Sequence, residues 1–220
     1  MTSLTPDQEA MALGWYGYGR WDAPYWFVGM EPGGDDLDEC VRMWNALGRQ
    51  ELIDIQGYRE DGDTDYVSPN AEPQRTWQKL IWLLLAYKGQ EPTPAAVLDY
   101  QHRYLGSGNG ESALVELSGL PARNNGVDVP RMMFRDKRTS LIREQMFQHK
   151  PKFAVFYSVD NSKGNKYVDA WEAITGVNPL WREEPVMVGS TACVMTYHPN
   201  GQWSKAYWVA IGEKLRKRFG

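Results

Sequence analysis

The sequence predicts an α/β protein, a three-layer α/β/α sandwich around a central four-stranded, mostly parallel sheet. Three observations predict this class. Short apolar runs recur along the chain, and glycine, proline or a polar turn stops each of them. Segments with the apolar spacing of a helix separate these runs. The runs are apolar on both faces, as is typical of strands that helices cover on each side.

Four segments are expected to form the strands. The first follows WYGYGRWDAP, which we expect to be irregular, and it ends at GMEPGGDD because proline and paired glycines stop a strand. The last begins after a Gly189-Ser190 turn, so PVMVGSTACVM is predicted to form a hairpin. The predicted strands are residues 25–30, 113–118, 153–157 and 192–197.

Six helices are predicted from apolar faces and from end signals. Asp36 suits a helix start, and Thr93 is expected to cap a helix that has Pro94 at its first position. Gly89 and Gly176 are expected to stop their helices. The predicted helices cover residues 37–47, 75–88, 94–105, 139–148, 167–175 and 204–219.

The composition is typical of one domain that spans residues 1–220, with a single core. Cys40 and Cys193 are too few for a metal site of their own and are typical of a reducing compartment. The first residues lack the pattern of a signal peptide, and the longest apolar segment, LIWLLLAY, is too short to cross a bilayer. A cytoplasmic protein with no membrane segment and no protein partner is expected.

Charge is unevenly distributed along a chain whose net charge is −4. Residues 31–65 contain eleven acidic and three basic side chains, whereas residues 131–152 contain seven basic and two acidic ones. An acidic protein with one basic face can still bind phosphates. The alternative is that these charged side chains only lie on helix surfaces exposed to solvent.

Two candidate catalytic side chains follow the first and last predicted strands. Glu31 lies in the loop after the first strand, and His198 follows the last one. The carboxyl ends of parallel strands share one edge of the sheet, where open α/β folds bind ligands. A carboxylate and an imidazole that meet there are suited to act as an acid–base or charge-stabilising pair. The alternatives are an ordinary strand–helix turn and a His198 that makes only structural hydrogen bonds.

With GMEPG at residues 29–33 and YHPNG at residues 197–201, the chain resembles the uracil-DNA glycosylase superfamily. Its members carry a first motif such as GQDPY or GMNPG and a last motif, HPS or a variant, at these strand ends. LIREQMFQHKPKFAVFYS and ALVELSGLPARNN are similar to two intervening segments of the superfamily. The resemblance extends from residue 27 to about residue 218.

The resemblance implies a role for each motif residue. Glu31 matches the residue that supports hydrolysis of the base–sugar bond, and His198 matches the histidine that stabilises the departing base. Gly29, Met30, Gly33 and Asn200 belong to the same motifs and are expected to bind the base. The chain lacks the four cysteines of the iron–sulfur branch, so no metal or other cofactor is expected.

Glu116 stands where the superfamily has the asparagine that reads uracil. An amide both donates and accepts hydrogen bonds, whereas an ionised carboxylate only accepts. Glu116 therefore suits a base edge with two donors, such as the N1–H and N2–H₂ of a guanine-like base. The alternative is a buried strand glutamate that pairs with an arginine such as Arg123.

DNA is the expected partner, and basic side chains are expected to contact its phosphates. Trp203 follows the last motif, where the superfamily has a loop that enters the duplex; the alternative is that it packs on the last helix. The expected nucleic-acid contacts are Arg131, Arg135, Lys137, Arg138, Trp203, Lys205 and residues 214–218.

The sequence leaves two functions open. The first is a metal-free hydrolase of a base–sugar bond in damaged or modified DNA. The second is a binding module that holds a base, a nucleotide or a nucleic acid in the same pocket, which the acidic residues 31–65 favour because they repel a phosphate backbone. A phosphate loop at Gly33-Gly34 is less well supported, because no lysine, serine or threonine follows the glycines.

Overall fold

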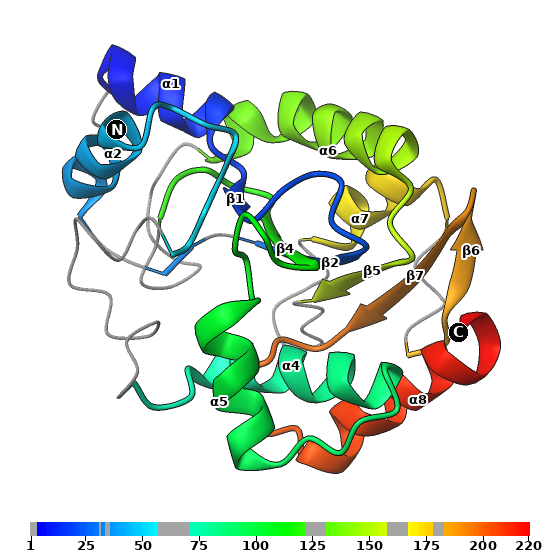
Figure 1. Cartoon of the computed structure of the whole chain (residues 1–220). Helices are drawn as coiled ribbons and strands as arrows, with labels where there is room; N and C mark the ends of the chain where they lie inside the picture. The colour runs from blue at the N-terminus through cyan, green and yellow to red at the C-terminus, as the bar shows by residue number, and fades with distance from the viewer. Residues whose placement is uncertain are drawn as a thin grey trace.

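A single mixed sheet of seven strands, in the order β3-β1-β4-β2-β5-β7-β6, runs through the described part of the chain (Figure 1). The computed structural model describes residues 4–30, 32–33, 36–56, 71–121, 131–157, 167–177 and 183–220. The strands are β1 (Gly17–Tyr18), β2 (Tyr25–Gly29), β3 (Leu52–Ile53), β4 (Ser112–Glu116), β5 (Phe153–Tyr157), β6 (Val186–Val188) and β7 (Thr191–Thr196).

The predicted α/β class is confirmed, but the predicted four-stranded sheet is wrong. The four predicted strands form its parallel centre, β4-β2-β5-β7. The predicted hairpin is present, since β6 pairs antiparallel with β7. On the other side, β1 pairs antiparallel with β4 and parallel with β3. The additional strands make the sheet wider, and their antiparallel pairs make it a mixed sheet.

The strand β1 lies within the segment that was expected to be irregular. Gly17 has φ 130°, and a Cβ there would collide with the carbonyl oxygen of Leu114. Glycine therefore allows β1 to approach β4 closely enough to pair. This two-residue strand depends on a close backbone contact that local propensity does not reveal.

The described helices begin and end largely where their capping signals predict. Asp36, Thr93 and Ser204 cap their helices through side-chain oxygens, and Gly176 ends another with φ 72°. One helix was not predicted, although Thr5 forms a capping box at its start. The helices are α1 (Pro6–Gly14), α2 (Leu37–Ala46), α4 (Arg75–Tyr87), α5 (Pro94–Arg103), α6 (Arg135–His149), α7 (Val168–Thr175) and α8 (Lys205–Phe219).

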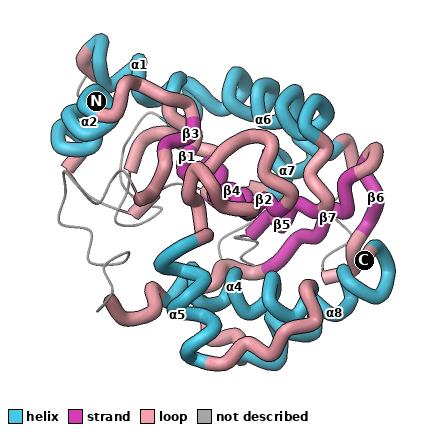
Figure 2. The backbone as a smooth tube through the Cα atoms, viewed as in Figure 1, coloured by secondary structure: helices cyan, strands magenta, loops and turns pink. Residues whose placement is uncertain are grey.

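Helices cover both faces of the central strands, so the core has two halves (Figure 2). In β2, Trp26 and Val28 pack in the half that contains α6 and α7, whereas Tyr25 and Phe27 pack in the half that contains α4, α5 and α8. Successive side chains of a strand point to opposite faces, so an apolar strand fills both halves. Among the described residues, no helix combines the length and apolar character needed to span a membrane.

The parallel centre of the sheet determines where a site can form. The last residues of its strands are Gly29, Glu116, Tyr157 and Thr196. We call this end of the sheet the carboxyl edge. The loops that leave it include the two motif segments.

Candidate functional site

The first motif leaves β2 along the end of β4. Leu117 donates its backbone N–H to the carbonyl of Gly29 at 2.9 Å, and Ser118 donates to that of Met30 at 2.7 Å. Strand-like pairing therefore continues beyond β2 and keeps Met30 buried, with 7% of its surface exposed. Glu31, the predicted catalytic carboxylate, lies outside the described residues. Gly33 is exposed, and a Cβ there would meet no atom within 4 Å.

Side chains at the carboxyl edge lie in register across three strands. Gly29 pairs with Glu116 of β4, and Val28 pairs with Phe156, so Tyr157 is the neighbour of Gly29 in β5. The ring of Tyr157 covers Gly29: a Cβ at Gly29 would lie 2.7 Å from ring atom Cε2 and would overlap the hydroxyl oxygen. Gly29 therefore has a steric reason to be glycine, in addition to its place in the motif.

His198 joins this row from the end of β7. Its imidazole meets the ring of Tyr157 edge-on, with centroids 6.0 Å apart and planes at 78°. Its Nδ1 accepts the backbone N–H of Asn200 at 3.0 Å. Because Nδ1 accepts, the neutral imidazole carries its proton on Nε2 and can donate from that atom.

The loop that carries His198 is held by α4. Lys79 donates Nζ to the carbonyls of Pro199 and Gly201, the second at 2.7 Å. Thr76 donates its hydroxyl to Oδ1 of Asn200 at 2.9 Å. Burial, and then the charge of Arg75, lowers the pKa of Lys79. The side chain of Asn200, predicted to bind the base, thus braces the loop on α4 in this structure.

We expect Lys79→Met to loosen this loop. The variant leaves two partly buried carbonyls without their donor, which costs about 1 kcal/mol of folding free energy. The amide of Asn200 should then exchange its hydrogen faster, because its bond to His198 depends on the shape of the loop. Hydrogen exchange followed by NMR measures this rate, and Arg75→Met, an exposed change on the same helix, is the control. Equal exchange in both variants contradicts the role of Lys79.

Arg138 lies in the core, and the prediction that it contacts nucleic acid is wrong. It is 1% exposed and donates to the carbonyls of Ala12, Glu116 and Leu117, each at 2.7 Å. Its guanidinium stacks 4.0 Å from the ring centroid of Tyr16. The pKa of Arg138 is lowered to about 10, mainly by burial, although charge interactions with Tyr16 and Glu116 partly offset this effect. The guanidinium is therefore charged at neutral pH.

Glu116 is buried, as the alternative interpretation of that residue predicted, and its backbone carbonyl accepts from Arg138 at 2.7 Å. It is 8% exposed, and it contributes a favourable charge interaction to Arg138. Arg123, the suggested partner, lies outside the described residues.

The other basic side chains that were expected to contact nucleic acid lie in two different parts of the molecule. Arg135 and Lys137 lie in the first turn of α6, next to Arg138 and therefore beside the end of β4. Arg135 covers the ring of Tyr167 at 5.4 Å, and Lys137 is exposed. The side chain of Arg131 is not among those described. Lys205 is exposed at the start of α8 and donates to the carbonyl of Pro92 at 2.6 Å.

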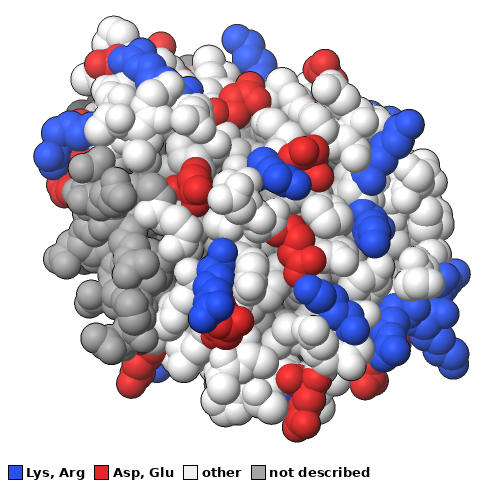
Figure 3. All heavy atoms as spheres, in the orientation of Figure 1, with Lys and Arg blue, Asp and Glu red and all other residues white. Residues whose placement is uncertain are grey.

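The basic cluster at residues 214–218, an expected nucleic-acid contact, lies towards the opposite end of the molecule from the His198 loop. The helix α8 starts after the His198 loop, and at 1.5 Å per residue the cluster, 9 to 13 positions after Lys205, lies about 14–20 Å along the helix from its start. Figure 3 shows lysine and arginine side chains gathered over this far end of α8. A nucleic acid held at the carboxyl edge contacts them only if it extends that far.

Trp203 packs on α8, as the packing interpretation predicted. Its ring stacks on Tyr197 with centroids 4.1 Å apart and planes at 16°, and it lies 4.8 Å from Tyr207. It is still 37% exposed. Entry into a duplex requires Trp203 to leave both tyrosines.

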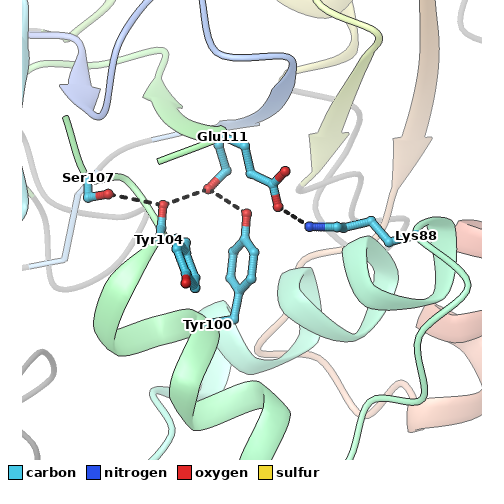
Figure 4. A network of polar contacts seen from close by, with 6 residues as sticks. Lys88, Tyr100, Tyr104, Ser107 and Glu111 are labelled. Atoms are coloured by element: carbon cyan, nitrogen blue, oxygen red, sulfur yellow. Dashed lines mark hydrogen bonds and ion pairs between the residues drawn. The ribbon is translucent and has the colours of Figure 1, made fainter. Parts of the chain in front are cut away.

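A second polar cluster, which the sequence did not reveal, lies at the amino end of β4 (Figure 4). Lys88 pairs with Glu111, and the Tyr100 hydroxyl donates to Ser112 at 3.3 Å. Ser112 and Ser107 each donate to the carbonyl of Tyr104 at 3.4 Å. These bonds join α5 to β4. The residues around the adjoining cavity of about 580 Å³ are Leu85, Lys88, Gln90, Ala96, Asp99, Tyr100, Tyr104, Asn109 and Glu111.

Sequence reasoning missed Tyr157, Lys79 and Thr76 at the carboxyl edge. Only Tyr157 carried a signal, as a polar ring that ends an otherwise apolar strand next to the motif edge. Within the described ranges, no group of three or more His, Cys, Asp or Glu side chains could hold a metal ion. No protein-family model matches the chain, and no curated protein matches it significantly. The chemistry assigned to the site therefore depends on its residues and their geometry.

Proposed function

We propose that the chain is a divergent uracil-DNA glycosylase-like hydrolase. In this proposal it flips a damaged or modified base out of DNA and hydrolyses the base–sugar bond, as a base-excision repair enzyme does. The observation that carries the proposal is the state of His198. Its Nδ1 accepts a hydrogen bond, so the neutral imidazole carries its proton on Nε2, at the same edge from which the first motif leaves β2.

Two charges develop as a base–sugar bond breaks, and the proposal assigns one residue to each. The sugar becomes oxocarbenium-like, and the Glu31 carboxylate is assigned to stabilise it and to orient water. At ~4 Å and an effective dielectric constant near 20, this attraction is about 4 kcal/mol. The departing base becomes negative, and His198 Nε2–H is assigned to donate to it. A neutral imidazole is sufficient for this role, because Nε2 only shares its proton with the departing base in a hydrogen bond and does not transfer it.

Glu116 is assigned to read the base. In this proposal Glu116 is ionised, so it accepts hydrogen bonds and donates none. We infer a base edge with two donors, as in guanine-like bases, in preference to uracil. Gly29 and Met30 supply the pocket wall, and Arg135, Lys137 and Lys205 are the described basic side chains best placed for phosphate contacts.

A binding module without catalysis is the second candidate. The acidic residues 31–65 favour it, because eleven acidic side chains against three basic ones repel a phosphate backbone. In that case the same edge holds a base or nucleotide, and the bond to the sugar stays intact. The two candidates share a pocket and differ only in whether base is released.

Base release from oligonucleotides that each carry one modified base tests the proposal. We expect cleavage of at least one member of a panel of uracil, hypoxanthine, xanthine and alkylated bases. Glu116→Asn restores the amide of the superfamily and should shift preference towards uracil by about 1–3 kcal/mol, or roughly 5- to 150-fold. The control is Glu213→Asn, an exposed change on α8. Binding without release from any substrate selects the binding module.

A further inference from the structure

We propose that Met132 and Met133 form an apolar wedge that enters a DNA duplex beside the flipped base. This inference rests on the proposed function and extends it, because it makes double-stranded DNA the substrate. In it, the two methionine side chains fill the gap that a base leaves in the stack when it rotates out. The wedge is thus assigned to a segment before α6, and no longer to Trp203 after the last motif.

The two methionines are exposed on a short segment that is well anchored. They belong to the 3-10 helix η2 (Arg131–Phe134), which leads directly into α6. Met132 is 65% and Met133 is 72% exposed, more than any other large apolar side chain that the structure describes. Phe134, the next residue, is buried and packs in one apolar cluster with Ala12 of α1. A fixed base thus presents two apolar side chains to solvent.

This segment lies beside the proposed site. Arg138 of α6 donates to the carbonyl of Glu116, the last residue of β4, at 2.7 Å. Met133 precedes Arg138 by 5 positions, or about 8 Å at 1.5 Å per residue. Leu37, the first residue of α2 after the first motif, packs against the same cluster as Phe134. The methionines therefore adjoin both the strand that carries Glu116 and the helix that follows the first motif.

Basic side chains follow the methionines in the first turn of α6. Arg135 and Lys137 lie there, and Lys137 is exposed. Asp136 offsets part of this charge, whereas the positive end of the α6 dipole adds to it. An apolar tip next to positive charge suits a duplex, because the tip contacts stacked bases while the charges contact phosphates. The nearby acidic side chains belong to α2, so the phosphate backbone is expected on the α6 side.

Methionine is well suited to insertion between bases. Its side chain is unbranched and ends in a polarizable thioether, so it adapts to an irregular gap, and it is one of the apolar residues that proteins insert between base steps. Trp203 is less suited, because its ring stacks on Tyr197 with centroids 4.1 Å apart. The exposed methionines lose little packing when they enter the duplex.

Binding to a duplex that cannot be cleaved tests the wedge. The probe carries one tetrahydrofuran abasic site, which leaves the gap of a flipped base, with 2-aminopurine as the neighbouring base. An inserted side chain separates this base from its neighbours, so its emission should rise when the protein binds. In the double variant Met132→Ser, Met133→Ser, we expect this rise to be lost and the affinity for the duplex to fall about tenfold, because two apolar side chains no longer leave water. Affinity for the same strand without its complement should change less than about twofold, because a single strand has no gap between stacked pairs.

Two further variants separate the wedge from other effects. Met187→Ser is the matched control, since Met187 is 47% exposed on the edge strand β6, and it should leave both affinities unchanged. Lys137→Met should weaken binding to the duplex and to the single strand alike. It should also reduce the log–log salt slope by about 0.9 for one lost phosphate contact, whereas the methionine variant keeps the slope of the unaltered protein.

An unchanged affinity of the methionine variant for the duplex overturns the wedge, as does an equal loss for duplex and single strand. Absence of binding to the duplex overturns it as well. If a base is released while duplex affinity does not depend on the methionines, the wedge fails and the proposed function stands. If no base is released but the rise in emission depends on the methionines, the hydrolase fails and the duplex-binding surface is supported.

Discussion

Replacing Glu31 with glutamine should slow base release by two to three orders of magnitude while substrate binding changes little. Glutamine keeps the size and the hydrogen-bonding ability of the side chain but removes its negative charge. In the proposed mechanism that charge stabilises the oxocarbenium only as the bond breaks, so its loss raises the activation free energy by about 3–4 kcal/mol. Single-turnover kinetics gives the rate of release, and a binding titration with uncleaved oligonucleotide gives the affinity.

The control for this experiment is Glu39→Gln. Glu39 lies in the same acidic segment, is exposed on α2, and pairs with the exposed Arg42 at 3.4 Å. Both variants therefore change the net charge of the segment equally. A rate that falls equally in both variants means that the segment acts by general repulsion. A rate that Glu31→Gln does not alter removes the catalytic role of Glu31 and supports the binding module.

The largest loss of stability is expected for Arg138→Met. The variant removes the donors for three carbonyls, those of Ala12, Glu116 and Leu117, and a positive charge that interacts favourably with Glu116. Leaving a buried charge and buried acceptors without their partner costs about 3–5 kcal/mol, even though methionine occupies much of the same space. Urea denaturation monitored by circular dichroism measures the change. Because α1, β4 and α6 meet at this guanidinium, they should lose protection from hydrogen exchange together.

Lys137→Met is the matched control for Arg138→Met. Lys137 precedes Arg138 on the same helix but is exposed, so its replacement should change stability by less than about 0.5 kcal/mol. If the protein binds DNA, Lys137→Met should weaken that binding, because its charge is accessible to a phosphate. Equal stability of the two variants is the result that would show Arg138 to be replaceable in the core.

The sequence by itself determined the parallel centre of the sheet and most helix boundaries. The strand β2 could be predicted because four consecutive apolar or aromatic residues are followed by a glycine-proline turn. The start of α5 could be predicted because Thr93 and Pro94 act within one turn of helix. Such signals are local: the residues that stop or cap an element are its neighbours in the chain. The shared edge of Gly29 and His198 follows from parallel strands, so it too could be predicted.

The tertiary structure alone decided which polar residues are buried. RDKRTS contains three basic residues within four positions, and nothing in it marks Arg138 as the one that enters the core. The contact of Lys79 with the carbonyl of Gly201 joins residues 122 positions apart. The short strand β1 pairs with the edge of β4, and β3 pairs in turn with β1. Such features depend on which surfaces meet after the chain has folded, because long-range packing chooses among local segments with similar propensities.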